Sequence, residues 1–490
     1  MLFNSVEFLL FFPIVVTIYF LCPQRYRWAF LLAASYVFYA AWRLEYVLLL
    51  LLSTVVDYFA ARKMGTVVDK AARRKYLFLS LAVNLGLLFT FKYFNFFNES
   101  LSGLLRVFNV DYQLPLLNVL LPVGISFYTF QSLSYVIDVY RGTVKPESHF
   151  GIFALYVSFF PQLVAGPIER AKHMLPQFHM QHFFNEGRIN SGLRLMLWGM
   201  FKKVVIADRL AVYVNQAYNN PADYDGAALL MATYFFAFQI YCDFSGYSDI
   251  AVGAAHILGF DLMENFRQPY VARSVAGFWR RWHISLSTWF RDYLYIPLGG
   301  SRVAPWRWYM NLAIVFLVSG LWHGGKSTFV IWGALHALYV LSEIWLGRAS
   351  LWGMARVGRE NQSLLPNWLK TVLTFHLILF SWIFFRANNL DDALLIIQNI
   401  GRMATTMPLV SLFAPWRDAG VADANTEMIL SVVLIIVLEI IQWFERYIAS
   451  MERTFISNPL WLRWLSYVAM AIAITNLGVS IDTPFIYFQF

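Results

Sequence analysis

Long apolar runs separated by short polar turns dominate the chain. In its first third, the runs cover about residues 6–22, 28–42, 45–60 and 76–97. About 20 predominantly apolar residues of helix cross the hydrocarbon core of a bilayer, so each run predicts a membrane helix. Further runs follow at about residues 117–138, 150–166, 189–207, 226–242, 311–323, 328–346, 369–385, 427–443 and 461–479. The pattern therefore predicts an all-α, polytopic membrane protein.

Proline and glycine interrupt two of these runs. Pro122 and Gly124 begin one, and Pro161, Gly166 and Pro167 end another. Such residues are tolerated at membrane depth when protein or a wet cavity satisfies the freed backbone groups, which predicts broken helices around a cavity. The alternative is that glycine and proline are simply commoner in membrane helices than in soluble ones.

The composition agrees with a membrane protein. Hydrophobic residues make up 59% of the 490 residues and charged residues only 14%, whereas soluble domains carry about 25%. A net charge of +9 is expected when Lys and Arg are retained on the cytoplasmic side beside anionic lipid, so it predicts no nucleic-acid partner. Cys22 and Cys242 are too few for a disulfide framework or a cysteine-rich metal motif.

The polar loops orient the chain. Residues 1–7 lack a basic stretch and residues 22–25 lack a cleavage site, so the first apolar run should remain as a membrane helix. Lys and Arg gather in loops 23–27 and 61–75, and such loops favour the cytoplasmic side. The two loops agree under alternation, which predicts an extracytoplasmic N-terminus.

Residues 261–310 combine seven arginines with many aromatic residues. On a helical wheel the two kinds separate, which predicts an amphipathic helix at the cytoplasmic interface or folded partly into the membrane. Its basic face would either hold the phosphates of a donor or anchor lipid headgroups. The aromatic face carries Phe278, Trp282, Leu286, Trp289 and Tyr293, and the opposite face carries Arg280, His283, Ser287 and Arg291.

His323 follows a strongly apolar run at residues 312–321. An imidazole at membrane depth is costly, so it marks a candidate functional site. Histidine exchanges protons near neutral pH and burial disfavours its charged form, so a buried His323 suits removal of a proton from a hydroxyl that attacks an acyl carbon. The competing interpretation, commoner for a single buried histidine, is a structural role with satisfied hydrogen bonds.

The remaining polar groups carry weaker signals. His179 and His182 have metal-ligand spacing, but two ligands without a third predict no metal site. Asp243, Ser245 and Asp249 cluster beside a membrane run, where they polarise a catalytic histidine, line a cavity or cap the next helix. The other histidines are assigned no chemistry: His256, His336 and His376 are expected to be structural, and His149, His173, His179 and His182 are expected in loops.

At these motifs the chain resembles the membrane-bound O-acyltransferase (MBOAT) family and, within it, the bacterial alginate O-acetyltransferase (AlgI-type) branch. The resemblance extends over essentially the whole chain, and the blocks around His283 and His323 are its most specific parts. The matching stretches are residues 121–127 (LPVGISF), 138–141 (DVYR), 165–167 (AGP), 241–249 (YCDFSGYSD), 264–270 (ENFRQPY), 278–287 (FWRRWHISLS), 291–296 (RDYLYI), 320–324 (GLWHG), 381–387 (SWIFFRA) and 484–490 (PFIYFQF).

The resemblance implies an MBOAT fold, with roughly 11–13 membrane helices around a tunnel and short interfacial helices beside them. It implies one domain over residues 1–490, with His323 as the catalytic residue and His283 as a second important site. The parts of this domain are N-terminal helices at 1–110, a catalytic core at 111–346 that contains the re-entrant or interfacial segment 261–310, and C-terminal helices at 347–490.

Members of this branch take acetyl from a cytoplasmic donor, acetyl-CoA, and pass it outward to a polysaccharide such as alginate, acetylated cellulose or peptidoglycan, usually with a separate extracytoplasmic transferase. For this chain the resemblance implies an O-acetyltransferase of the bacterial inner membrane that uses acetyl-CoA as co-substrate, holds no cofactor and has an extracytoplasmic partner protein. The stretch 325–327 (GKS) departs from the family, where alanine, asparagine and an aromatic residue are commoner, and this departure bears on the acceptor rather than on the reaction.

Roles follow for individual residues. His323 is expected to deprotonate the acceptor hydroxyl, while His283 positions the donor or shuttles the proton. The expected donor-binding residues are Arg280, Arg291, Trp282 and Ser287, and the expected cavity-lining residues are Asp243, Ser245, Trp322 and Lys326. Two alternatives stay open: a D-alanyl transferase of the same family, with a carrier-protein donor and a teichoic-acid acceptor, and a non-enzymatic polymer transporter.

Overall fold

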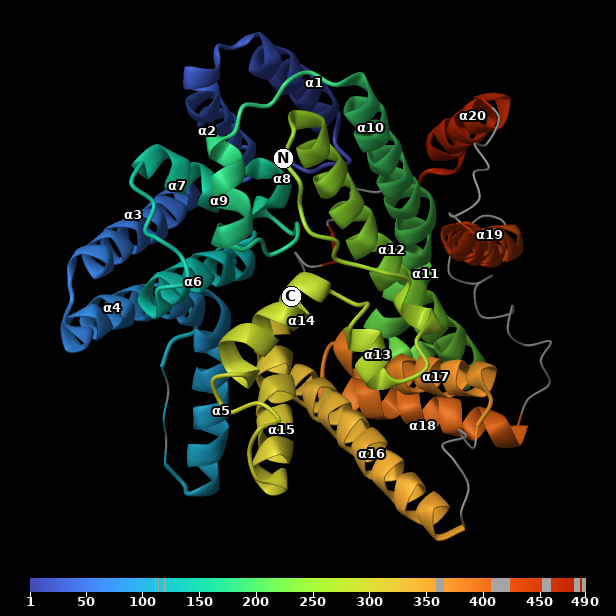
Figure 1. Ribbon diagram of the computed structural model, residues 1–490. Coiled ribbons are helices and arrows are strands. Elements are labelled where there is room, and N and C mark those ends of the chain that lie inside the picture. The colour runs from blue at the N-terminus through green and yellow to red at the C-terminus, as the bar shows by residue number, and fades with distance from the viewer. Residues whose placement is uncertain are drawn as a thin grey trace. The chain divides into compact units, whose positions relative to one another are not determined.

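The computed structural model describes residues 1–110, 112, 114–118, 120–357, 365–406, 424–451, 460–479 and 485–486, and every regular element among them is helical. The chain divides into two compact units (helices labelled in Figure 1). The first unit consists of Met1–Met196, Tyr247–Asn265 and Thr288–Tyr293, and the second of Leu197–Gly246, Phe266–Ser287 and Leu294–Phe490. The single domain expected over residues 1–490, with its three parts, stays a prediction.

The first unit is a set of helices in which α3 and α4 lie side by side and α6 packs against both. Asp57 of α3 is fully buried there and accepts hydrogen bonds from Ser80 and Asn84 of α4, at 2.5 and 2.8 Å. Polar bonds of this kind hold membrane helices together where the apolar surroundings give no driving force. Its elements are α1 (Val6–Leu21), α2 (Gln24–Ala40), α3 (Glu45–Thr66), α4 (Lys70–Leu88), the π-helix η1 (Phe89–Tyr93), α5 (Phe94–Val107), α6 (Ile125–Arg141), α7 (Phe150–Ser158), α8 (Phe160–Leu163), α9 (Ala171–His179) and most of α10 (Glu186–Met200).

The second unit holds both candidate catalytic histidines. Its helices α15 and α16 run side by side, and α17 packs against α16. Its elements are the π-helix η2 (Phe201–Ala207), α11 (Asp208–Asn219), the short turns η3 (Pro221–Asp223) and η4 (Pro269–Val271), α13 (Val275–Trp279), α15 (Pro305–His323), α16 (Ser327–Val357), α17 (Asn367–Arg386), α18 (Leu390–Thr406), α19 (Ala424–Met451) and α20 (Leu460–Leu477). The helices α12 (Gly226–Leu258) and α14 (Ile284–Phe290) and the π-helix η5 (Arg291–Tyr295) each contribute residues to both units.

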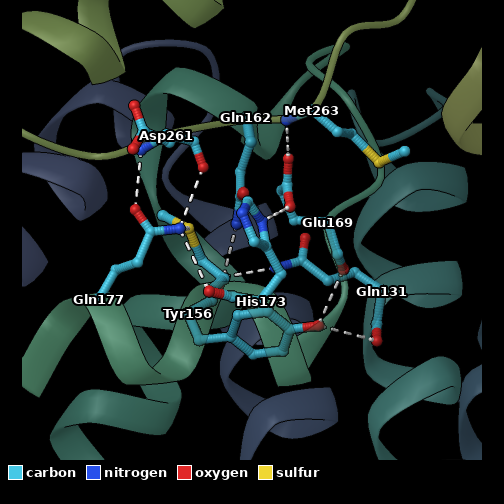
Figure 2. A network of polar contacts seen from close by, with 9 residues as sticks. Gln131, Tyr156, Gln162, Glu169, His173, Gln177, Asp261 and Met263 are labelled. Atoms are coloured by element: carbon cyan, nitrogen blue, oxygen red, sulfur yellow. Dashed lines mark hydrogen bonds and ion pairs between the residues drawn. The ribbon is translucent and has the colours of Figure 1, made fainter.

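The broken helix predicted near Pro161 is present in the first unit. α7 stops at Ser158 and α8 is a single turn. Gln131 and Gln162 both donate to the carbonyl oxygen of Tyr156, at 2.5 and 2.8 Å, and the Tyr156 hydroxyl donates to the carbonyl of Glu169 at 3.0 Å (Figure 2). Buried protein groups thus satisfy the backbone around the break, as membrane depth requires.

The segment that follows the break is held by α9. The Glu169 carboxylate, almost fully buried, bonds the ring of His173 at 2.9 Å and accepts from the backbone N–H of Met263 at 2.5 Å. Gln177 and Asp261 bond each other reciprocally through side chain and backbone, at 3.0 and 2.7 Å (Figure 2). His173 and His179 therefore belong to a helix, and the prediction that they lie in loops is wrong.

The membrane helices were largely predictable. All thirteen apolar runs contain helix, although α12 extends to Leu258 and the fourth run is divided by a π-helical turn. Among the described residues, five helices are long and apolar enough to cross a membrane, and α1 is a shorter apolar helix. The polytopic all-α class is therefore confirmed, while the tunnel stays a prediction. The sequence missed α9, α11 and α18, because their polar positions break up the apolar runs.

The continuous amphipathic helix expected between Phe278 and Tyr293 is wrong. α13 ends at Trp279, a turn follows, and α14 begins only at Ile284. Trp282, His283 and Leu286, expected on opposite faces, are all buried. The wheel assumed a straight helix with one wet face, whereas this segment turns sharply at His283 and buries aromatic and polar side chains together.

Candidate active site

His323 and His283 share one neighbour in the second unit, Trp322. The indole ring centroid lies 4.9 Å from that of His323 and 5.9 Å from that of His283. His323 is 4% exposed and His283 is fully buried. The two histidines predicted to work together are therefore placed around a single aromatic side chain.

His323 is the last residue of α15, and aromatic rings surround it. The rings of Trp332 on α16 and Phe385 on α17 lie edge to face with the imidazole, at 5.0 and 5.1 Å. Gly320 makes this packing possible, because a Cβ there would lie only 2.3 Å from the carbonyl oxygen of Phe329. Small residues let two membrane helices approach this closely.

His283 occupies a strained backbone position. Its φ is +43°, in the left-handed region that residues with a side chain rarely adopt. The ring packs against Phe244 at 4.7 Å and Phe266 at 6.3 Å between centroids. Strain of this kind persists only where the surroundings enforce it, and it concentrates at functional sites.

A basic cavity of about 1030 Å³ lies in the same unit. Three parts of the chain form its wall: the segment around α13, the N-terminal end of α17 and the C-terminal half of α19. The described lining contains no carboxylate. Two hydrogen bonds join Arg267 and Arg281: the backbone N–H of Arg267 donates to the Arg281 carbonyl at 2.9 Å, and Nη1 of Arg281 donates to the Arg267 carbonyl at 3.3 Å. The lining residues are Arg267, Val271, Ala272, Arg273, Ser274, Gly277, Arg280, Arg281, Asn367, Trp368, Thr371, Val372, Trp443 and Arg446.

The predicted donor-binding residues separate into three groups. Arg280 lines the cavity. Trp282 does not line the cavity and packs in an aromatic cluster with Phe278 at 5.4 Å and Trp382 at 5.1 Å between ring centroids. Ser287 donates to the Trp282 carbonyl at 3.2 Å. Arg291 belongs to the first unit, where it bonds its neighbour Asp292 at 2.8 Å. Sequence reasoning missed Arg446 and Trp443, because only folding brings α19 to this cavity.

Asp243 and Ser245 bond lysines of η2. Asp243 accepts from Lys203 Nζ at 2.6 Å and from the backbone N–H of Ile486 at 2.8 Å, and Ser245 accepts from Lys202 at 2.9 Å. Lys203 also reaches Asp208, at 2.7 Å. Asp243 lies within α12, and its carboxylate forms a buried ion pair, which is none of the roles predicted for it. Lys203 is a site residue that the sequence could have flagged, since a cation within an apolar run is costly.

Lys326 stands between His323 and the first turn of α16, with its side chain exposed. The buried Arg386 at the end of α17 lies within its electrostatic reach. Arg386 donates to the amide oxygens of Asn215 and Asn219, at 2.8 and 3.3 Å. Two cations thus lie close to the end of α15 that carries His323. The described residues contain no cluster of three His, Cys, Asp or Glu side chains that could hold a metal ion.

Comparison with known proteins assigns the chain to a family. The model of the membrane-bound O-acyltransferase family matches residues 147–385, which include both histidines. A relative from Pseudomonas aeruginosa named "Probable alginate O-acetylase AlgI" is 43% identical over 80% of this chain and 73% of its own length. Its namesake from Pseudomonas putida is 38% identical over the full length of both chains, and a peptidoglycan O-acetyltransferase from Helicobacter pylori is 34% identical over 94% and 91%. This chain is therefore a member of the membrane-bound O-acyltransferase family and an acyl-transferring enzyme.

Proposed function

We propose that this protein is an O-acetyltransferase that moves acetyl from acetyl-CoA to a hydroxyl group of an exported polysaccharide. The names of its relatives support acetyl as the group and a polymer as the acceptor. The observation that carries the choice of donor is the basic cavity, which lies in the same unit as His323 and is joined to it by one helix.

α17 connects the two places. Val372 lines the cavity near one end of the helix, and Phe385 packs against His323 near the other. The two residues are separated by 13 positions, about 20 Å of helix at 1.5 Å per residue. Coenzyme A has the corresponding shape, with phosphates and adenine at one end and the thioester at the far end of a long pantetheine arm.

The chemistry of the cavity fits the phosphate end of this donor. Guanidinium groups bind phosphate through paired hydrogen bonds, and Trp368 and Trp443 offer flat surfaces on which an adenine can stack. Within the described chain, the Nη1 of Arg446 is buried and has no hydrogen-bond partner. A buried unpaired donor on a cationic group is expensive, and a bound phosphate would satisfy it.

In the reaction, His323 accepts the proton of the acceptor hydroxyl as its oxygen attacks the thioester carbonyl. The new carbon–oxygen bond forms, the carbon–sulfur bond breaks, and the proton passes to the departing thiolate of CoA. His283 then positions the thioester or relays the proton. A placed general base contributes about 10²–10⁴-fold to the rate.

The setting of the reaction is also part of the proposal. The protein would lie in the bacterial inner membrane with its N-terminus in the periplasm and its arginine cavity facing the cytoplasm. Loops rich in Lys and Arg support this orientation. On the periplasmic side, the acceptor hydroxyl would belong either to a sugar of the polymer or to a serine of an acetyltransferase partner protein that delivers the acetyl group to the polymer.

Purified protein in nanodiscs tests the proposal. With acetyl-CoA and an oligosaccharide acceptor, release of free CoA should fall about 10²–10⁴-fold in His323→Ala. The matched control is His376→Ala, which removes a histidine of α17 whose ring bonds Tyr234 at 2.8 Å. A His323→Ala variant with full CoA release would refute the role of His323, and wild-type protein in proteoliposomes that moves polymer across the bilayer without releasing CoA would favour the transporter.

A second measurement tests the donor site. Arg280→Gln/Arg281→Gln should weaken binding of acetyl-CoA, while Arg302→Gln, an exposed arginine of the same unit, should not. Binding of each variant to vesicles with and without phosphatidylglycerol tests the alternative that the cavity holds an anionic lipid headgroup. If the double variant changes lipid binding and leaves acetyl-CoA binding intact, the cavity is a headgroup site and the donor assignment fails.

A further inference from the structure

α16 carries two polar side chains that hold α13, the short helix of the arginine cavity. Glu343 accepts hydrogen bonds from the backbone N–H groups of Val275 and, at 3.2 Å, Ala276. His336 accepts from the indole N–H of Trp279 at 3.2 Å. These contacts lie at the two ends of α13, so hydrogen bonds from α16 side chains hold both ends of that helix.

The hydrogen bonds of His336 define its tautomer. An indole N–H only donates, so Nδ1 of His336 must be the acceptor and its proton lies on Nε2. Nε2 lies 3.1 Å from the Ser381 hydroxyl, which itself donates to the Ile378 carbonyl at 2.7 Å. Both neighbours therefore require the same neutral form, and the chain of bonds ends at a backbone carbonyl. This arrangement fixes geometry and offers no route for a proton.

The first turn of α13 is fully satisfied by side chains. Ser274 accepts from the N–H of Gly277 at 2.9 Å, and Glu343 takes the two N–H groups before it. Arg280, one residue beyond the helix, lies within electrostatic reach of the same carboxylate. Since Ser274, Gly277 and Arg280 all line the cavity, these bonds set the position of its arginine wall.

The same face of α16 also contacts the catalytic histidine. Trp332 lies one turn before His336, and their rings are 4.7 Å apart. The Trp332 ring also lies 5.0 Å from His323 and 5.6 Å from Trp279. Residues 332, 336 and 343 fall on one side of a helix with 3.6 residues per turn. α16 thus touches the catalytic base with one side chain and the donor wall with the next two.

We propose that His336 and Glu343 are positioning residues for the donor: by docking α13 on α16 they set the arginine wall at a fixed distance from His323. This inference rests on the proposed function, because it assigns the cavity to acetyl-CoA. Neither side chain touches the reacting atoms, so their loss should change the affinity for the donor and leave the chemical step intact.

The kinetic test compares variants that differ in one hydrogen bond. His336→Leu removes both bonds, whereas His336→Asn keeps an acceptor near the place of Nδ1. We expect the KM for acetyl-CoA to rise about tenfold in His336→Leu, with kcat within about twofold of wild type, and to recover in His336→Asn. Trp279→Phe should reproduce the increase, and combining it with His336→Leu should add little more, since both remove the same bond.

Hydrogen exchange gives a readout that does not depend on turnover. The amides of Val275 and Ala276 should exchange slowly in wild type and faster in Glu343→Ala, with α18 unchanged. Wild-type protein without CoA release would defeat the proposed function, and the exchange rates would still decide whether Glu343 holds α13. Unchanged exchange in Glu343→Ala, or equal KM values in His336→Leu and wild type, would overturn the positioning role.

Discussion

Gly333→Ala is a sharp test of the packing that holds His323. Gly333 on α16 faces α15, and a Cβ there would lie 2.4 Å from the carbonyl oxygen of Phe316, where ordinary contact begins at 3.4 Å. The opposing atoms belong to a backbone, so no side-chain rotation relieves the clash. The helices must separate by about 1 Å, the difference between these two distances.

The magnitude of the effect follows from what moves. Overpacking of this kind costs about 1–3 kcal/mol of stability. Trp332 is the preceding residue and contacts the His323 ring, so it shifts with α16. A misplacement of about 1 Å at a reacting centre can cost about 10²-fold in rate. We therefore expect kcat for CoA release to fall about 10- to 100-fold, with a smaller change in the KM for acetyl-CoA.

Gly347→Ala is the matched control, because it makes the same substitution on the same helix where a Cβ meets no atom within 4 Å. Both variants would be purified in nanodiscs, checked for monodispersity and thermal midpoint, and assayed for CoA release. If Gly333→Ala retained the kcat of Gly347→Ala while remaining folded, the close approach of α15 and α16 would have no part in placing His323.

Three further predictions use other parts of the chain. The hydrogen bond to Glu169 raises the pKa of His173 above the unfolded value of about 6.5. This pair therefore stabilises the protein below pH 6.5, and the stabilisation is lost as the pH rises through the raised pKa. Between pH 6 and 8, the thermal midpoint of wild type should fall by more degrees than that of His173→Ala. The effect should be small, because the His173 side chain is 49% exposed. Asp243→Asn removes one carboxylate from the buried Lys203 and leaves Asp208 as its described carboxylate partner. The substitution should lower the free energy of unfolding by about 3–5 kcal/mol and reduce the thermal midpoint. An unchanged midpoint would contradict the buried pair. Treatment with EDTA should leave CoA release unchanged, because the proposed transfer uses a histidine as general base and no metal ion; loss of activity that zinc or magnesium restores would contradict that mechanism.

The sequence predicted best the features that depend only on local runs of residues along the chain. Apolar runs gave the membrane helices, because the thickness of a bilayer fixes how many apolar residues a helix needs. The cost of an imidazole in an apolar run singled out His323. Helices such as α9 and α18 were not predicted, because a short or strongly amphipathic helix contains no continuous apolar run.

What depends on folding was harder to predict. The wheel placed Arg280 and His283 on one wet face, but α13 ends at Trp279, and His283, in the left-handed region just before α14, is fully buried while Arg280 stays exposed. The partner of Asp243 lies 40 residues earlier on another element, so no local pattern indicates the pair. Arg446 reaches the cavity from a helix that is more than 160 positions away from Arg280 in the chain. Sequence patterns show which residues are costly to bury, but only the fold shows which partner offsets that cost.

In the proposed mechanism, two helices link the donor cavity to His323, and this predicts a distinctive kinetic signature. α17 separates Val372 in the cavity from Phe385 at His323, and α16 contacts both the base and the arginine wall. Changes to the wall, at Arg280 or His336, should therefore act on the KM for acetyl-CoA, while changes at His323 or Gly333 should act on kcat. A polymer transporter that merely used these polar groups to line a path would release no CoA, so it would have no KM for acetyl-CoA that could change separately from kcat. The division itself thus separates acyl transfer from transport, even before the acceptor polymer is identified.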